Sequence, residues 1–488
     1  MPTPPTPRCP MMTPFLCPPT PSDLAPIGIA LPRDFPKFTG LAFDSRRVQA
    51  GDVFFALEGG EVDSMAFVPD AVSRGAVAVV ACHPVVTDVP VVVVPSARLA
   101  LSLFCAAAFA PQPETVVAVT GTNGKTSVAN FCHRLWMAMG LPSAAMGTLG
   151  VQTTRDFVLS DSLTTPDPIT LHRHLNHLAQ TGIQHVALEA SSHGLHQHRL
   201  DGVKLRAAAW TNFTQDHLDY HKTFDAYFAA KARLFLDLLT PPHTAVIGAN
   251  LPDTLEDACR TRGLSILRLG RDLDIQDLQP TPQGLQMTLV YRGERAPLTL
   301  PLYGTFQAEN VAAAVGLLLG YGHDFGDIVS VLPQLRGVVG RMENVHSGDM
   351  SVFVDYAHTP DALEKALNHL RPHTTGRLWV VFGCGGNRDA GKRPLMGAVA
   401  HRLADGVYVT DDNPRFEDAA LIRQAIMATC PNAIEIPDRA AAIYAALGAA
   451  KAGDTVIIAG KGHEQGQIIG QTTIPFSDQA TIRSFFGE

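Results

Sequence analysis

Apolar residues in this chain form short continuous runs, which alternate with longer stretches where they recur every three or four positions. Short runs bounded by glycine, proline or polar residues are typical of buried strands, and the wider spacing is typical of helices with one buried face. Before residue 113 the pattern predicts strands over 51–57, 76–81 and 89–94 and helices over 67–75 and 98–109.

The same alternation continues through the middle of the chain. It predicts strands over 115–120, 185–190, 207–213 and 244–248 and helices over 126–139, 168–180, 223–239 and 309–319. Residues 273–303 differ, because short alternating patches separated by Gly and Pro favour an antiparallel insert.

The last part of the chain predicts strands over 352–355, 378–382, 407–410, 433–436 and 455–458, with helices between them. Repeated strand–helix units predict an α/β fold with parallel sheets, helices on both faces and ligand sites at the carboxyl ends of the strands. A length of 488 residues suggests about three domains. We predict a disordered Pro-rich leader over 1–23 and domains over 24–112, 113–338 and 339–488.

Composition and charge exclude several classes of partner. The formal net charge of −8 gives no basic footprint for nucleic acid. The longest apolar stretch, 76–94, is broken by Pro84, Asp88 and Pro90, so we expect no membrane insertion. The leader lacks the basic and apolar segments of a secretory signal, and eight scattered cysteines fit a reducing compartment. We therefore expect a cytoplasmic protein, acting as a monomer.

The strongest chemical signal follows the predicted strand over 115–120. Glycines there would let backbone N–H groups surround phosphate oxygens, Lys125 could reach the β- and γ-phosphates, and the Thr126 hydroxyl could bind Mg²⁺. Val119 stands where the usual phosphate-binding loop has its first Gly, so this is a variant of that motif. An ordinary glycine turn is the alternative, which is disfavoured because strand, turn, lysine, hydroxyl and helix follow in order. The loop reads Gly121-Thr122-Asn123-Gly124-Lys125-Thr126-Ser127.

Two further segments of the middle region carry candidate chemistry. Glu189 ends a predicted strand and could hold Mg²⁺ opposite the loop hydroxyl, as acidic residues do in other NTPases. Lys231 falls on the apolar face of the helix predicted over 223–239. Such a lysine either extends its ammonium group to water or has a buried partner or modification, and composition alone favours the first. The histidines at 172, 174 and 177 do not share one helix face, so we expect them to be solvated.

Three loops at predicted strand ends could converge in the last domain. Residues 386–393 nearly repeat the phosphate-binding motif, but Arg393 replaces the hydroxyl, which favours a carboxylate-binding loop over a second nucleotide site. Residues 411–415 are by default a Pro-anchored turn, although they could equally present acid, amide and guanidinium groups to a zwitterion. Residues 460–464 follow the last predicted strand, and the three loops could form one pocket.

On these motifs the chain resembles the Mur ligase family, the ATP-dependent amide-bond ligases of bacterial peptidoglycan precursor synthesis, from about residue 40 onwards. The resemblance implies a UDP-sugar-binding α/β domain, a central P-loop ATPase-like domain with a mostly parallel sheet, and a C-terminal Rossmann-like α/β domain. It also implies two Mg²⁺ ions held by Thr126, Glu189, His217 and Lys231, with Lys231 as N6-carboxylysine. That implication reverses the preference for a solvated Lys231.

The resemblance assigns the remaining site residues as well. The catalytic group would be Lys125, Lys231, His217 and Glu189. ATP would be bound by the loop 121–127 together with Asn310, Arg341, Asp355 and His358. The UDP-MurNAc-dipeptide would contact Phe43, Ser45, Thr164, Thr165, Ser191, Gln197 and Arg199. The chain departs from the family at Asp63-Ser64-Met65, where the family has Asp-Gly and a basic residue.

Diaminopimelate-adding members of the family carry an arginine at the position of Arg415, and lysine-adding members do not. The chemistry agrees, because meso-diaminopimelate has a distal carboxylate that a guanidinium can bind in a bidentate manner. The implied diaminopimelate site is Arg388, Asp412, Asn413, Pro414, Arg415, Gly460 and Glu464. A lysine-adding relative, a folylpolyglutamate-synthase-like ligase and a non-catalytic nucleotide-binding switch are the alternatives. The N-terminal domain, the 412–415 loop and the complete metal set speak against them.

Overall fold

The computed structural model describes residue 31 and residues 35–58, 64–155 and 163–488, so the predicted leader over 1–23 and Asp63 lie outside the described residues. By its internal contacts the chain divides into two compact units. One holds the chain up to Lys125 together with Gly140–Leu267, and the other holds Thr126–Met139 together with Arg268–Glu488.

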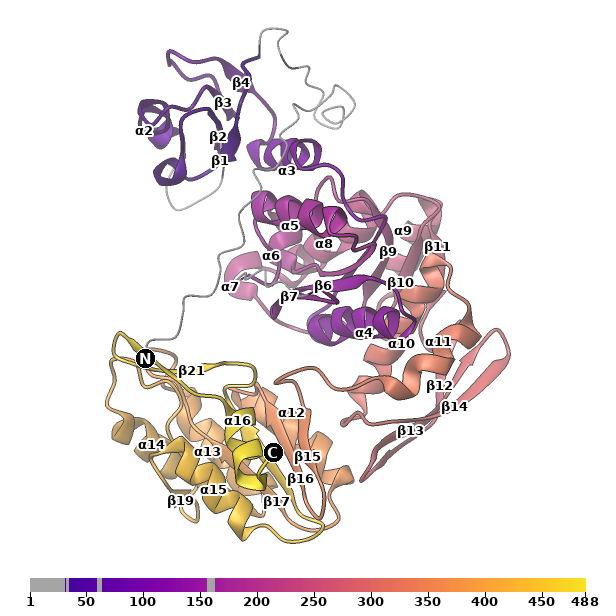
Figure 1. The fold of residues 1–488 in the computed structure, drawn as a ribbon, viewed down its shortest axis with the longest axis vertical. Helices are drawn as coiled ribbons and strands as arrows, with labels where there is room; N and C mark the ends of the chain where they lie inside the picture. Colours follow the sequence, from indigo (N-terminus) through magenta and orange to yellow (C-terminus); the bar gives the residue numbers. More distant parts are fainter. Residues whose placement is uncertain (1–30, 32–34, 59–63, 156–162) are drawn as a thin grey trace. The chain divides into compact units, whose positions relative to one another are not determined.

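The N-terminal part of the first unit contains a four-stranded parallel sheet (Figure 1). Its inner strand β2 is buried on both faces, and Val, Phe and Phe follow one another there without a polar break. Phe55 packs edge-on against Phe104 with ring centroids 5.2 Å apart. The elements are β1 (Gly40–Ala42), β2 (Asp52–Ala56), α2 (Val68–Ser73), β3 (Ala78–Ala81), β4 (Val91–Val93) and α3 (Ala97–Ala108).

The rest of the first unit is built on a seven-stranded sheet in the order β11-β10-β9-β5-β8-β6-β7. The sheet is mostly parallel, and β7 runs antiparallel to β6. Because β5 lies between β9 and β8, the loops that follow these three strands emerge at one edge. The strands are β5 (Thr115–Thr120), β6 (Ser143–Gly147), β7 (Gly150–Thr153), β8 (His185–Glu189), β9 (Leu205–Trp210), β10 (Thr244–Ile247) and β11 (Ser265–Arg268).

The helices of this unit confirm the helical pattern with one correction. The helix predicted over 168–180 is α5 with the same bounds. The helix predicted over 223–239 ends at Arg233 and continues as a π-helical turn over Leu234–Leu238. The histidine prediction is wrong, since His172 and His174 are buried. The helices are α5 (Pro168–Gln180), α6 (Ser192–His196), α7 (Leu218–His221), α8 (Phe224–Arg233) and α9 (Asp253–Thr261).

The second unit begins with the antiparallel insert predicted from the sequence, a three-stranded meander. Helix α4 packs beside α10 in this unit, with Cys132 Sγ 3.9 Å from the carbonyl oxygen of Ala314. The elements are α4 (Lys125–Ala138), β12 (Leu273–Thr281), β13 (Gly284–Tyr291), β14 (Glu294–Leu300), α10 (Phe306–Tyr321) and α11 (Phe325–Val331).

A six-stranded sheet in the order β15-β16-β20-β17-β18-β19 forms the rest of the second unit. Only β15 pairs antiparallel, so the α/β fold class is confirmed. The strands are β15 (Glu343–Ser347), β16 (Ser351–Asp355), β17 (Leu378–Phe382), β18 (Gly406–Val409), β19 (Ile434–Glu435) and β20 (Thr455–Ala459), and a hairpin follows, β21 (Gly466–Ile469) and β22 (Thr472–Pro475). The helices are α12 (Pro360–Leu370), α13 (Lys392–Leu403), α14 (Ala419–Met427), α15 (Arg439–Ala449) and α16 (Asp478–Phe486).

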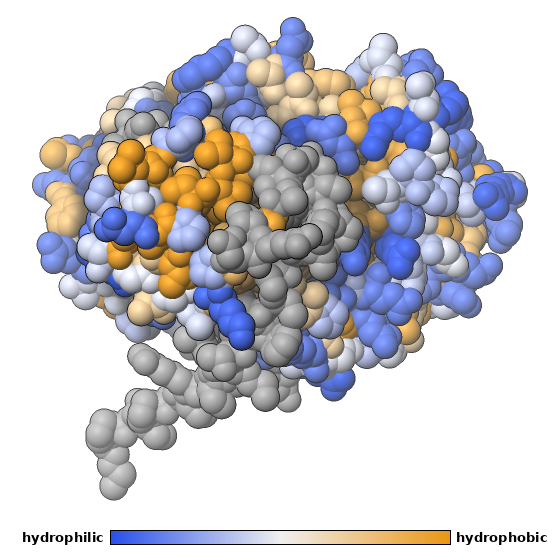
Figure 2. Space-filling view, turned by 90° about the horizontal axis from the view of Figure 1, so that it is seen from above, coloured by the Kyte–Doolittle hydropathy of each residue, from blue (hydrophilic) through white to orange (hydrophobic). Residues whose placement is uncertain are grey.

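Within the described ranges, no helix has both the length and the apolar character that crossing a bilayer requires. On the face drawn in Figure 2, hydrophobic residues gather in places between larger hydrophilic areas. Apolar atoms make up much of the surface of any folded chain, so such areas alone assign no function.

Candidate active site

The loop after β5 is shaped by two glycines with positive φ, +151° at Gly121 and +88° at Gly124. A Cβ at Gly121 would collide with the Thr211 hydroxyl, so this position needs glycine. The loop is held against the segment after β9, where the backbone N–H of Asn123 donates to Asn212 Oδ1 at 2.9 Å. Lys125 Nζ lies over the loop, 2.9 Å from the carbonyl oxygen of Gly121. Sequence and geometry thus agree on a tight glycine turn carrying a lysine.

Lys231 does not reach water. Its side chain is 1 % exposed, and Nζ donates to the carbonyl oxygen of Gly121 at 2.7 Å. The ammonium also lies 4.7 Å from the ring centroid of Tyr227. Burial, reinforced by the positive charge of Lys125, lowers the pKa of Lys231 well below its ordinary value. The preference for a solvated lysine is therefore wrong, because the side chain is buried, and burial favours the neutral amine over the ammonium form relative to water.

Glu189 ends β8 as a buried carboxylate. Its Oε1 accepts from the backbone N–H of Thr148 at 2.9 Å, and its Oε2 accepts from the Thr148 hydroxyl at 3.3 Å. A Cβ at Gly147, the last residue of β6, would collide with Oε1, so this position needs glycine to admit the side chain of Glu189. A carboxylate fixed at a strand end can act as a metal ligand.

His217 sits in the left-handed region, with φ +52°, in the loop before α7. Its ring centroid is 4.8 Å from that of His193 and 6.2 Å from that of Tyr227. His221 lies in the same group, and burial together with the neighbouring histidines and Lys231 lowers its pKa to about 4. Sequence reasoning left His193 unassigned, although it follows β8 just as His217 follows β9.

Five of the residues expected to bind the dipeptide form one hydrogen-bonded network around the end of β8. The Thr165 hydroxyl donates to the carbonyl oxygen of Glu189 at 2.8 Å and accepts from the backbone N–H of Ser191 at 3.0 Å. Arg199 donates to the carbonyl oxygen of Thr165 at 2.6 Å and to Gln197 Oε1 at 2.7 Å. The Thr164 hydroxyl joins this network through the Thr148 hydroxyl, 3.1 Å away.

Phe43, the residue that follows β1, lies in the same region. It lines a pocket with Gln197 and Arg199, and the wall is completed by Leu57, Arg98, Leu101, Asp167 and Pro168. Ser45 does not line this pocket; its hydroxyl and Arg74 hold the pKa of Asp70 below its usual range. The structure therefore brings Phe43, but not Ser45, to the predicted substrate residues.

Three of the residues expected to contact ATP, Arg341, Asp355 and His358, lie around the end of β16. Asp355 accepts from the backbone N–H groups of Met342 and Ala357 at 2.7 and 2.9 Å, while burial raises its pKa. The Arg341 guanidinium lies 4.7 Å from the ring centroid of Tyr356. His358 is exposed, with Nδ1 2.8 Å from the carbonyl oxygen of Tyr356.

Asn310 is placed differently from the other ATP candidates. It is buried in α10 and donates to Gln307 Oε1 at 2.9 Å within the same helix.

The three C-terminal loops lie against one another, as the sequence predicts. The Gly386 N–H donates to the carbonyl oxygen of Asn413 at 2.9 Å, and Arg415 donates to the carbonyl oxygen of Gly386 at 2.9 Å. A Cβ at Gly460 would lie 2.8 Å from Asp412 Oδ2, so the loop after β20 also passes close by.

Tyr356 links this cluster to the end of β16. Burial raises its pKa, the carboxylates of Glu464 and Asp412 add to the rise, and Arg341 and Arg388 oppose it. Charged residues of the expected ATP site and of the expected diaminopimelate site therefore both act on the pKa of Tyr356.

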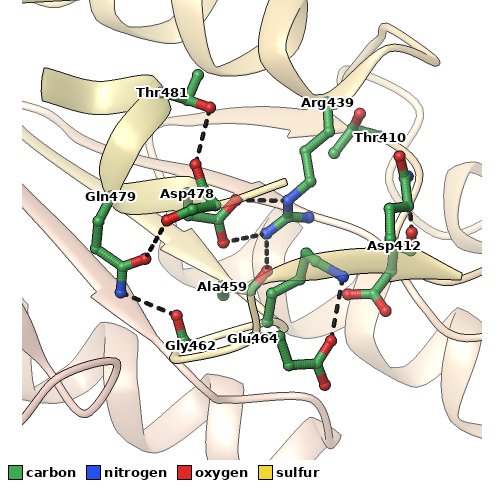
Figure 3. A network of polar contacts seen from close by, with 12 residues as sticks. Thr410, Asp412, Arg439, Ala459, Gly462, Glu464, Asp478, Gln479 and Thr481 are labelled. Atoms are coloured by element: carbon green, nitrogen blue, oxygen red, sulfur yellow. Dashed lines mark hydrogen bonds and ion pairs between the residues drawn. The ribbon is translucent and has the colours of Figure 1, made fainter. Parts of the chain in front are cut away.

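Sequence reasoning missed residues that support these loops. Lys461 is buried and joins Asn413 to Glu464. Arg439 and Asp478 form a fully buried ion pair behind them (Figure 3). A sequence signal existed only for Lys461, a lysine between two glycines directly after a strand.

Three of the four residues in the expected metal set would offer oxygen donors to Mg²⁺, and His217 would offer a ring nitrogen. Within the described ranges, no group of three or more His, Cys, Asp and Glu side chains could hold an ion. Only Glu189 and His217 of the expected set are of those types. The other donors would be the Thr126 hydroxyl, in the first turn of α4, and a carboxylate oxygen of N6-carboxylysine at position 231. Hard oxygen donors of this kind suit Mg²⁺.

Comparisons with known proteins give consistent results. Three family models match: Mur ligase family, catalytic domain, over residues 37–109; Mur ligase middle domain over 119–318; and Mur ligase, glutamate ligase domain, over 340–462. A UDP-N-acetylmuramoyl-L-alanyl-D-glutamate–2,6-diaminopimelate ligase from Bradyrhizobium diazoefficiens is 49% identical over 91% of this chain and 94% of that protein.

Another relative and a solved structure carry the same name. The relative, from Agrobacterium fabrum, is 48% identical over 92% of this chain and 93% of its own length. The solved structure has a TM-score of 0.74 at 35% identity and covers 96% of this chain and 98% of its own.

Proposed function

This chain belongs to the Mur ligase family, and from that premise we propose that it is an ATP-dependent ligase. It would join meso-2,6-diaminopimelate to the γ-carboxyl group of D-Glu in UDP-MurNAc-L-Ala-D-Glu. Relatives named for this reaction are 48–49% identical over more than nine-tenths of the chain, which supports the proposal. The UDP-sugar, ATP and amino-acid roles would fall on residues 24–112, 113–338 and 339–488. The enzyme would act as a cytoplasmic monomer.

The observation that carries the proposal is the buried Lys231 beside the loop after β5. A lysine with a strongly lowered pKa, held 2.7 Å from the Gly121 carbonyl oxygen, is costly for stability. As a neutral amine it can attack CO₂, forming an N–C bond and releasing one proton, so that the position becomes an anion. A non-catalytic nucleotide-binding switch has no need of such a group.

The reaction would proceed through an acyl phosphate. The γ-carboxylate of D-Glu attacks the γ-phosphorus of ATP and ADP leaves; the neutral amine of diaminopimelate then attacks the acyl carbon and phosphate leaves. Two Mg²⁺ ions, held by Thr126, Glu189, His217 and the carboxylated Lys231, would supply neutralising charge at the phosphates. Lys125 balances charge on the transferring phosphoryl group, and the Thr165–Arg199 network holds the acid that is activated.

Arg415 would select the acceptor. One of its N–H groups is held by the carbonyl oxygen of Gly386, which fixes the side chain while leaving other donors for a carboxylate. Diaminopimelate differs from lysine by that distal carboxylate, and a charge-assisted pair with arginine discriminates strongly.

The test compares diaminopimelate with L-lysine as acceptor, in the wild type and in Arg415→Ala. We expect ligation with diaminopimelate in the wild type, and a KM for diaminopimelate raised about 10- to 100-fold in the variant. Equal use of lysine by the wild type would overturn the specificity. Phosphate release at the same rate with and without each amino acid would favour the nucleotide-binding switch instead. Ligation of glutamate to a folate would favour the folylpolyglutamate-synthase-like alternative.

A further inference from the structure

Two loops of the C-terminal sheet are joined at one buried ammonium group. Lys461, in the loop after β20, is 1 % exposed. Its Nζ donates to Asn413 Oδ1 at 2.9 Å, in the loop after β18, and pairs with Glu464 Oε2 at 3.1 Å. Asn413 Nδ2 closes the triangle by donating to the same Glu464 oxygen at 2.9 Å. Three side chains from two loops therefore hold one another.

The amide of Asn413 is nearly fully engaged by these contacts. Oδ1 accepts from Lys461 and also from the backbone N–H of Ile468 at 2.9 Å, which uses both of its lone pairs. Nδ2 gives one of its two hydrogens to Glu464. Asn413 thus serves mainly as a structural junction. Both hydrogen bonds that Glu464 accepts from described residues fall on Oε2, which leaves Oε1 for a ligand.

The hairpin β21–β22 fastens the same loop from the other side. Arg415 has a left-handed backbone, φ +53°, which is unfavourable for a side chain of its size. Its N–H donates to the carbonyl oxygen of Ile468 at 3.0 Å, and its carbonyl oxygen accepts from Gly470 at 2.7 Å. Asn413 Oδ1 accepts from Ile468 of the same hairpin, so the backbone that carries the guanidinium is tied to the junction at Asn413.

We propose that Lys461 is a positioning residue for the amino-acid acceptor. Its ammonium group locks Glu464 and the 412–415 loop into one rigid unit, so that a carboxylate and a guanidinium stand ready for the opposite charges of a zwitterionic acceptor. Lys461 itself, enclosed by its partners, does not touch the ligand. This inference rests on the proposed ligase function and deepens it.

The first experiment measures steady-state kinetics of Lys461→Met, an apolar side chain of similar length. We expect the KM for diaminopimelate to rise about 10- to 100-fold, because Glu464 and Asn413 each lose a charged partner. The kcat and the affinity for ATP should change less than threefold. Lys451→Met, at an exposed position of the same domain, is the matched control and should leave all three values unchanged.

A double-mutant cycle separates positioning from a general loss of structure. Glu464→Gln alone should raise the KM for diaminopimelate, and Lys461→Met/Glu464→Gln should raise it by much less than the product of the single effects. If the rise in KM in the double variant equals the product of the two single rises, or if Lys461→Met leaves the KM unchanged, the inference is overturned. The proposed function still holds in either case, provided that the wild type ligates diaminopimelate. Wild-type protein that ligates no diaminopimelate would overturn the function itself.

A second variant keeps the test decisive if Lys461→Met does not fold. Asn413→Asp retains an acceptor for Lys461 and Ile468 but places a like charge against Glu464. We expect the same selective rise in the KM for diaminopimelate. An unchanged KM in this variant would contradict the proposed junction.

Discussion

Breaking the ion pair between Arg439 and Asp478 should destabilise the C-terminal sheet strongly. Both side chains are fully buried, and Arg439 binds both carboxylate oxygens at 2.7 and 2.8 Å. The same guanidinium donates to the carbonyl oxygen of Ala459, the last residue of β20, at 3.1 Å (Figure 3). The pair therefore anchors the strand from which the 460–464 loop begins.

The magnitude follows from what each substitution leaves behind. Arg439→Met strands a buried carboxylate, which costs about 3–5 kcal/mol. Arg439→Met/Asp478→Leu removes both charges, and such replacements are about neutral, apart from about 1 kcal/mol for the carbonyl oxygen of Ala459, which loses its donor. The double variant should thus be more stable than the single variant. Arg402→Met, which breaks an exposed pair with Glu364, should cost less than about 1 kcal/mol.

The loss of stability around β20 can be measured by hydrogen exchange in the full-length protein, with mass spectrometry of peptides that cover this strand. A loss of 3–5 kcal/mol corresponds to exchange faster by a factor between about 100 and several thousand. Equal acceleration in the single and the double variant would refute the reasoning, because it would show that packing, and not the stranded charge, dominates.

Three further substitutions probe the site and the core. Lys125→Ala should abolish ligation without changing the circular dichroism spectrum, because its ammonium balances phosphate charge; near-normal turnover would refute that role. Lys231→Met should lose activity at least about 100-fold while its thermal midpoint stays the same or rises, because a costly buried amine is replaced by an apolar group; a marked fall in the midpoint would contradict this. Burial lowers the pKa of His172 to about 4, so the unfolded chain binds more protons below about pH 6.5 and stability falls as the pH drops towards 4. His172→Gln should flatten the pH dependence of the thermal midpoint, whereas exposed His401→Gln should leave its slope unchanged.

Much of the fold could be predicted because its main strands are continuous apolar runs. The strands over 115–120 and 378–382 have the predicted bounds, since burial on both faces leaves no ambiguity about their ends. Strands β1 and β7 were missed because they are short and owe their pairing to neighbours rather than to their own composition.

Tertiary contacts decide what the sequence left open in the site. Lys231 on an apolar helix face is compatible with solvent or with burial, and the partner that settles it, the carbonyl oxygen of Gly121, lies 110 positions away. The burial of His172 was not foreseen because helix spacing tests only whether the histidines could share a metal ion, whereas its ring is enclosed by the fold, with Nε2 3.3 Å from the carbonyl oxygen of Asp201. No periodic pattern in the sequence points to Lys461, because its contacts form only when two loops that are distant in the sequence come together. The family resemblance predicted which residues belong to the site. The contacts that hold those residues in place could be identified only from the structure.

The most direct measurement of the central claim follows an oxygen atom. UDP-MurNAc-L-Ala-D-Glu labelled with ¹⁸O in both oxygens of the γ-carboxylate is ligated to diaminopimelate with unlabelled ATP, and the released phosphate is analysed by mass spectrometry. Activation as an acyl phosphate predicts that each phosphate carries one labelled oxygen. Unlabelled phosphate accompanying amide formation would contradict the account.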